Sequence, residues 1–160
     1  MTKEKEPRLR PAKRSVARLK DKLRDVLRKG RGKSLVKVIS ILTPILRGWS
    51  QYFKLSKVKQ PFIELDEWIR HRLRAIIWRH WRRPPTRYRK LLLRGLCHER
   101  AHKAAYNGYG PWLNARTSNM NIAFPKAFFS NMGLISLLES FESLKPRSRT
   151  AVYGSVRTVV

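Results

Sequence analysis

The sequence predicts a mainly α-helical protein, in which a three-helix bundle is followed by short helices and irregular segments. Over three long stretches between residues 14 and 83, apolar residues recur three and four positions apart, which is the spacing of one helix face. Proline or glycine recurs at short intervals after residue 83, so the elements there must be short. A chain of 160 residues is long enough for such a bundle to bury a hydrophobic core.

The first predicted helix runs from Ser15 to Gly30. Residues 1–13 before it are basic and polar, and we expect them to form a flexible lead-in without a core. Ser15 is the expected N-cap, and Gly30 follows the basic last turn as a stop signal. We expect Asp21 and Asp25 to form ion pairs with neighbouring basic residues of the helix. The apolar stripe consists of Val16, Leu19, Leu23, Val26 and Leu27.

The second predicted helix begins at Ser34, another expected N-cap. Pro44 lacks the N–H that an interior helix residue donates, so we expect it to interrupt the helix and Thr43 to cap a new segment. Aromatic residues then follow at helical spacing, which favours packing in the core. These expected core residues are Trp49, Tyr52 and Phe53.

The third predicted helix begins near Asp66 and ends before Pro84 and Pro85. We expect Trp68 to pack in the core as well. The apolar stripe consists of Leu65, Ile69, Leu73, Ile76 and Ile77. This helix completes the bundle predicted over residues 14–83.

Residues 84–143 are predicted to form a helical extension. We expect a short basic helix through "RYRKLLLRG", a helix from His98 to Tyr106, and two short helices within "FPKAFFSNMGLISLLESF". Residues 144–160 are basic and rich in serine, threonine and valine, and we expect a loose tail, with a strand through "TAVYGSVRTVV" as the alternative.

The charge of the chain favours a polyanionic partner. Lysine and arginine number 37 against 10 aspartates and glutamates, a formal net charge of +27. These positive charges repel one another unless a polyanion neutralises them, and nucleic acid is the commonest polyanion in a cell.

No apolar run approaches the roughly 20 residues that a membrane span needs, and the single cysteine, Cys97, excludes an internal disulfide. We therefore expect a cytoplasmic protein that does not enter a membrane.

One stretch concentrates the basic residues without acidic neighbours. Ten lysines and arginines and no aspartate or glutamate lie between Trp68 and Arg94, whereas a solvated helix face usually mixes both signs. Guanidinium groups suit phosphate oxygens, and aromatic rings stack on unpaired bases. The candidate phosphate contacts are Lys33, Arg70, Arg74, Arg79, Arg82, Arg83, Arg87, Arg89 and Lys90. The candidate stacking residues are Trp78, Trp81, Tyr88 and Trp112. The alternative for each arginine is a solvated side chain without a partner.

Three kinds of enzyme site can be tested against the sequence: a zinc site, a phosphate-binding loop and a two-metal centre. His98, Glu99 and His102 match the H-E-x-x-H pattern of zinc hydrolases, but a third ligand is hard to find, so we expect no metal. "GRGKS" resembles the end of a phosphate-binding P-loop, but Leu27 stands where the first glycine belongs. The three aspartates are too scattered for a two-metal centre. We therefore expect a binding protein without catalytic residues or cofactor, with a zinc hydrolase as the alternative.

Three segments together resemble the C-terminal part of bacterial group II intron reverse transcriptase–maturases. They are "SVARLKDKLRDVLRKGRGKSLVKVISILTPILRGWSQYFKLS", "LDEWIRHRLRAIIWRHWRRPPTRYRKL" and "GPWLNARTSNMNIAFPKAFFSNMGLISLLESF", within residues 8–142. The most specific pieces are the run from Pro44 to Trp49 with Tyr52 and Phe53, and Leu65-Asp66 with the run from Trp68 to Arg74. The resemblance implies the thumb, or X, maturase-specific domain, a mainly helical unit that grips intron RNA and the template–primer duplex.

By this resemblance, the protein helps group II intron RNA to fold and splice, while the RNA performs the chemistry. The family's Tyr-x-Asp-Asp polymerase motif, its fingers and its His/Cys-bearing endonuclease are absent from the sequence. We therefore expect a fragment, a truncated remnant or a separately expressed domain, monomeric when alone. The alternatives are a remnant that binds nucleic acid non-specifically, and a module whose aromatic C-terminal region, including Phe128 and Phe129, docks onto a separately encoded protein.

Overall fold

A computed structural model describes residues 9–144, so most of the predicted lead-in and the tail from residue 145 lie outside the described residues. Within 9–144 the chain forms nine α-helices and one short 3₁₀ helix, with no strand. The prediction of a mainly α fold is confirmed. None of the helices in this range is long and apolar enough to cross a membrane.

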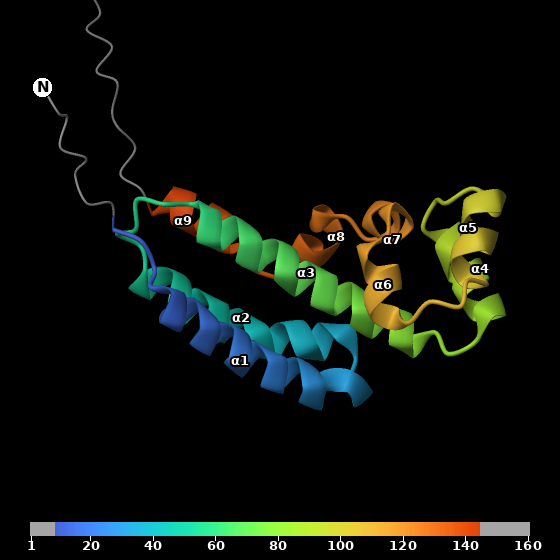
Figure 1. Ribbon diagram of the computed structural model, residues 1–160, viewed down its shortest axis with the longest axis horizontal. Coiled ribbons are helices and arrows are strands. Elements are labelled where there is room, and N and C mark those ends of the chain that lie inside the picture. Colours follow the sequence, from blue (N-terminus) through green and yellow to red (C-terminus); the bar gives the residue numbers. More distant parts are fainter. Residues whose placement is uncertain (1–8, 145–160) are drawn as a thin grey trace, which may run out of the picture.

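Three long helices run along the long axis of the molecule, and each is antiparallel to the one before it (Figure 1). They are α1 (Lys13–Lys29), α2 (Leu35–Tyr52) and α3 (Gln60–His80), and the 3₁₀ helix η1 (Gly30–Gly32) connects the first two. Each of the three packs against the other two through its apolar face. The three-helix arrangement that the hydrophobic spacing predicted is therefore present.

Two helix starts differ from the prediction. The amides of Ser15 and Val16 both donate to the carbonyl of Ala12, so Ala12 rather than Ser15 is the N-cap of α1. Helix α3 begins at Gln60, six residues before Asp66, because Pro61 in its first turn has the fixed φ of a helix and lacks only an N–H that needs no partner there. The N-cap expected at Ser34 is correct, since its hydroxyl accepts from the amide of Lys37 at 3.4 Å.

Pro44 does not interrupt the second helix. It lies inside α2, which continues to Tyr52. An interior proline costs about 3 kcal/mol, but apolar side chains on both sides of it are fully buried, and each contributes about 1.5–3 kcal/mol. These buried residues are Val38, Ile39, Leu42 and Leu46. Burial on both sides of the proline therefore outweighs the missing hydrogen bond.

Six short helices follow the bundle. They are α4 (Pro84–Leu93), α5 (His98–Ala105), α6 (Pro111–Arg116), α7 (Ser118–Ala123), α8 (Lys126–Asn131) and α9 (Leu137–Ser143). Helix α6 packs against α3, and α9 packs against both α2 and α3. Helices α4 and α5 pair at one end of the molecule, whereas α9 lies toward the opposite end (Figure 1). The sequence indicated α4, α5, α8 and α9, but not α6 and α7.

One buried hydrophobic cluster extends from Leu19 in α1 to Phe141 in α9. Leu73 is fully buried within it. Trp49, Phe53 and Trp68 are half-buried and pack against it.

Tyr52 was expected in the core but is 81% exposed. It is the last residue of α2, where its ring contacts the edge of Phe53 with centroids 4.8 Å apart and extends into solvent.

The aromatic C-terminal region faces inward. Phe129 is 1% exposed, and Phe141 stacks on Phe62 of α3 with ring centroids 4.5 Å apart. Phe128 is half-buried against the same cluster. These rings hold the short helices to the bundle, so they do not form an exposed docking surface for a second protein.

Asp66 joins α3 to the start of α9. Its carboxylate is 6% exposed and accepts from the Ser136 hydroxyl at 2.7 Å and from the amides of Leu137 and Leu138 at 2.8 and 3.0 Å. A carboxylate at a helix N-terminus satisfies the unpaired amides and complements the positive end of the helix dipole. Asp66, which the sequence suggested as the start of α3, instead caps another helix.

Candidate nucleic-acid interface

Six of the candidate RNA contacts, all of them basic, lie exposed around the end of α3. Arg79 is in the last turn of α3. Two other arginines lie in the connection from α3 to α4, one arginine and one lysine lie in α4, and a further lysine lies directly after η1. These residues are Lys33, Arg79, Arg82, Arg83, Arg89 and Lys90. Arg70 is half-buried on the side of α3 that faces Asn121 and Arg116. Arg82, Arg83, Arg89 and Lys90 are exposed in the α3–α4 connection and in α4, and we call this basic surface the α3–α4 surface.

Trp78 and Trp81 cannot stack on bases, contrary to the prediction. Trp78 is fully buried and Trp81 is 9% exposed, with their ring centroids 6.1 Å apart. Trp81 also packs on Phe124 at 5.6 Å. The helical spacing placed both rings outside the apolar stripe that faces the bundle, which is why they were expected to be accessible. The segment from α4 to α8 covers that side of α3 instead. The buried indole nitrogen of Trp78 has no hydrogen-bond partner among the described residues.

Several arginines of the basic stretch support the fold. The Nε–H of Arg74 donates to the carbonyl of Phe124 at 3.0 Å, and that of Arg87 donates to the carbonyl of Trp81 at 2.8 Å. The Arg87 guanidinium lies over the Trp78 ring at 4.8 Å. Arg74 is 8% exposed, and burial lowers its pKa to about 10, with repulsion from Arg70 adding to the effect. Arg74 is therefore not available to RNA phosphates, and Arg87 is partly used internally.

Arg94 has the same kind of role. Its Nε–H donates to the carbonyl of Ala123 at 2.9 Å, and its guanidinium lies over Phe124 and Phe128 at 5.1 and 4.6 Å. A planar guanidinium can stack on a ring and donate to a carbonyl simultaneously. Some arginines of this stretch therefore have carbonyl and aromatic partners inside the protein. These partners explain in part why the stretch contains no acidic residues.

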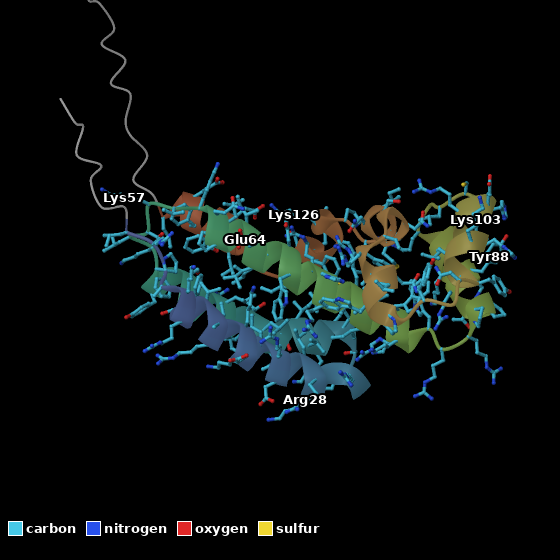
Figure 2. All side chains as sticks on the ribbon, viewed as in Figure 1. Arg28, Lys57, Glu64, Tyr88, Lys103 and Lys126 are labelled. Carbon is cyan, nitrogen blue, oxygen red and sulfur yellow. The ribbon has the colours of Figure 1, made fainter. Side chains whose placement is uncertain are left out.

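The H-E-x-x-H residues lie on α5 beside Tyr88 of α4. The Tyr88 hydroxyl is 2.6 Å from Nδ1 of His98, and the ring of His102 stacks on Tyr106 with centroids 4.6 Å apart. Glu99 forms an ion pair with Lys103 at 3.0 Å, which lowers the Glu99 pKa. Figure 2 labels Tyr88 and Lys103 at the α4–α5 end of the molecule. Within residues 9–144, no group of three histidine, cysteine or acidic side chains is placed to hold a metal ion.

The "GRGKS" segment forms η1 and the N-cap of α2 rather than a phosphate-binding loop. Gly30 is buried in the α1–α2 turn, where a Cβ would lie 2.8 Å from Cγ2 of Val38. Ser34 caps α2, while Lys33 and Arg31 are exposed. The glycine therefore permits close packing of the turn on α2.

A second basic site lies between the first and third helices, where sequence spacing did not bring its members together. Arginines of α1, η1 and α3 line a cleft of about 380 Å³, which we call the arginine cleft. The apolar residues lining it include Leu27 of α1 and Ala75 and Ile76 of α3. The arginines are Arg24, Arg28, Arg31, Arg72 and Arg79.

Trp112 of α6 closes one side of this cleft and packs on α3. Its ring stacks on His71 with centroids 3.6 Å apart, and its carbonyl is 3.0 Å from the His71 Nε2. Burial lowers the pKa of His71, and the positive charges of Arg116, Arg72 and Arg74 lower it further, although the hydrogen bond to Trp112 opposes them. Trp112 is 38% exposed. Its ring thus contacts other residues of the chain on the face that was expected to stack on a base.

One known protein family matches the part of the chain that contains both basic sites. Residues 16–95, half of the chain, match the family model of the group II intron maturase-specific domain. No curated protein is significantly similar to the chain. The matched range contains α1 from residue 16 on and all of α2, α3 and α4. It therefore includes both the arginine cleft's five arginines and the α3–α4 surface. The chain belongs to the family of group II intron maturase-specific domains.

Proposed function

We propose that this chain binds group II intron RNA and helps it to reach its splicing-competent fold. The protein supplies binding energy and the RNA supplies the catalytic groups. The observation that carries the proposal is that the family match over residues 16–95 includes the exposed α3–α4 surface. The sequence between Ile69 and Arg94, which contains this surface, has no aspartate or glutamate.

The charges of this surface suit a phosphate backbone. Arg82, Arg83, Arg89 and Lys90 are exposed, and no ion pair to an acidic side chain occupies them within residues 9–144. In contrast, the ion pairs of α1 join Asp21 to Arg24 and Asp25 to Arg28 and Lys29, as the sequence predicted. Cations without internal partners can release counterions from RNA, which produces affinity that falls as salt rises.

A salt-titrated binding assay tests the proposal. The purified full chain is titrated into a group II intron RNA and into an unrelated structured RNA of equal length. We expect tighter binding to the intron RNA, and we expect the preference to persist as salt rises. Equal binding of the two RNAs that disappears at high salt would leave a non-specific basic protein and refute the maturase role.

A pair of charge-matched variants locates the surface. Arg82→Ala combined with Arg83→Ala should lower the slope of log affinity against log salt by about one to two, because each phosphate contact contributes about 0.7–0.9. Lys54→Ala combined with Lys57→Ala removes the same charge near the start of α3, at the opposite end from α4 and α5, where Figure 2 labels Lys57. A larger loss in this control would place the RNA elsewhere.

A further inference from the structure

The arginine cleft concentrates cations that the protein itself does not neutralise. Five arginines and two aspartates line it, a formal excess of three positive charges. Asp21 is paired with Arg24 at 2.7 Å, and Asp25 is paired with Arg28 at 2.6 Å. The arginines left without an acidic partner among the described residues are Arg31, Arg72 and Arg79.

These three cations lie close enough to repel one another. Burial lowers the pKa of Arg72, and the charges of Arg24, Arg79 and Arg31 lower it further. Burial and the charge of Arg31 also lower the pKa of Arg79. Holding like charges together in a partly buried cleft is unfavourable unless an anion joins them.

Arg72 is held in position by two tryptophans. Its guanidinium lies 5.1 Å from the ring centre of Trp68 and 4.5 Å from that of Trp112. Lys20 and Arg24 also lie over the Trp68 ring, at 5.8 and 5.7 Å. Contact with two rings restricts the guanidinium, so less conformational entropy is lost when its donors bind a ligand.

The Nε–H of Arg72 is not a donor for a ligand in the cleft. The atom is buried and forms no hydrogen bond among the described residues, so an anion in the cleft cannot reach it. The terminal NH groups of the guanidinium are the donors that a ligand would meet. The cleft thus combines a positioned cation with two further arginines that lack an acidic partner among the described residues.

We propose that the arginine cleft binds consecutive phosphodiester groups of one RNA strand and is a principal anchor of the RNA on this domain. This inference rests on the proposed function, because it takes RNA as the ligand. Phosphates suit the site because several guanidinium forks converge on it, and each fork matches the geometry of phosphate oxygens. RNA held here would cross from α1 to α3.

Two charge-matched double variants test the anchor. Arg31→Ala with Arg79→Ala removes the unpaired cations of η1 and α3, whereas Arg18→Ala with Lys22→Ala removes two exposed charges of α1 that lie outside the cleft. We expect the cleft variant to lose about tenfold or more in RNA affinity, since a hydrogen bond to a charged group contributes about tenfold or more. The control should lose much less, and circular dichroism should show unchanged helicity in both.

Arg72→Lys separates position from charge. It keeps the cation but removes the planar fork and most of the stacking between the tryptophans. We expect weaker RNA binding with a nearly unchanged salt slope. An affinity equal to that of the unaltered protein would show that the stacked geometry is not used.

Inorganic pyrophosphate separates this inference from the proposed function. Calorimetric titration at low salt should show binding to the unaltered chain and to the Arg18/Lys22 control, but a clear loss in the Arg31/Arg79 variant. If intron RNA binds and both double variants respond equally, the cleft is not the anchor and the proposed function stands. If intron RNA does not bind but pyrophosphate binding depends on the cleft, the proposed function fails and the cleft remains a phosphate site.

Discussion

Replacement of Asp66 by alanine should destabilise the protein strongly, although Asp66 forms no ion pair among the described contacts. Its carboxylate accepts three hydrogen bonds from the start of α9, two of them from the backbone amides of Leu137 and Leu138. Alanine accepts none of them. The first turn of α9 then loses its attachment to α3.

The magnitude follows from the exposure of each donor. The Leu137 amide bond is buried, and stranding that donor costs about 1–3 kcal/mol. The Leu138 amide and the Ser136 hydroxyl are partly exposed, so water can replace part of the loss. Loss of negative charge at the helix N-terminus adds about 0.3–1 kcal/mol. The expected total is about 3 kcal/mol.

Urea unfolding and thermal melts followed by circular dichroism measure this difference. A loss of about 3 kcal/mol corresponds to a fall in Tm of about 6–12 °C for a chain of this size. Glu67→Ala is the matched control, because the neighbouring Glu67 is exposed and its loss should change stability by less than about 0.5 kcal/mol. If Asp66→Ala costs no more than this control, the attachment of α9 through Asp66 is not a stabilising contact.

Three further results are expected. Gly30→Ala should destabilise by about 1–3 kcal/mol, because its Cβ would lie 2.8 Å from Val38, whereas Gly48→Ala meets nothing within 4 Å and should stabilise α2 by about 0.5–1 kcal/mol in urea unfolding. The folded-state pKa of His71 is lowered, so the unfolded chain binds this proton more readily, and stability should fall as pH drops below about 6.5. His71→Gln should flatten that part of the Tm profile, and an unchanged profile would contradict the assignment. Arg74→Met should leave RNA affinity and its salt slope unchanged, since Arg74 is 8% exposed; a lower slope would place this side chain at the interface.

Several local features of the fold were predictable because their partners lie within one or two helical turns, although the N-cap at Ser15 and the interruption at Pro44 were wrong. The cap of α2 at Ser34 involves an amide three residues away, and the ion pairs of Asp21 and Asp25 join residues three or four apart. The stripe from Leu65 to Ile77 follows helical periodicity and is buried throughout. The resemblance to maturases also rests on short runs of residues, and the family match confirms it.

The sequence by itself determined the helical class, the three long amphipathic helices and the basic character, since each depends on composition or on spacing within one helix. Tertiary structure decided which side chains remain available to a ligand. Asp66 caps a helix that begins 71 residues later, and Trp78 is covered by segments beyond α3. The arginine cleft unites Arg31 of η1 with Arg72 of α3 only because α1 and η1 pack beside α3. Periodicity assigns a residue to a face of its helix, but what covers that face depends on contacts between distant segments.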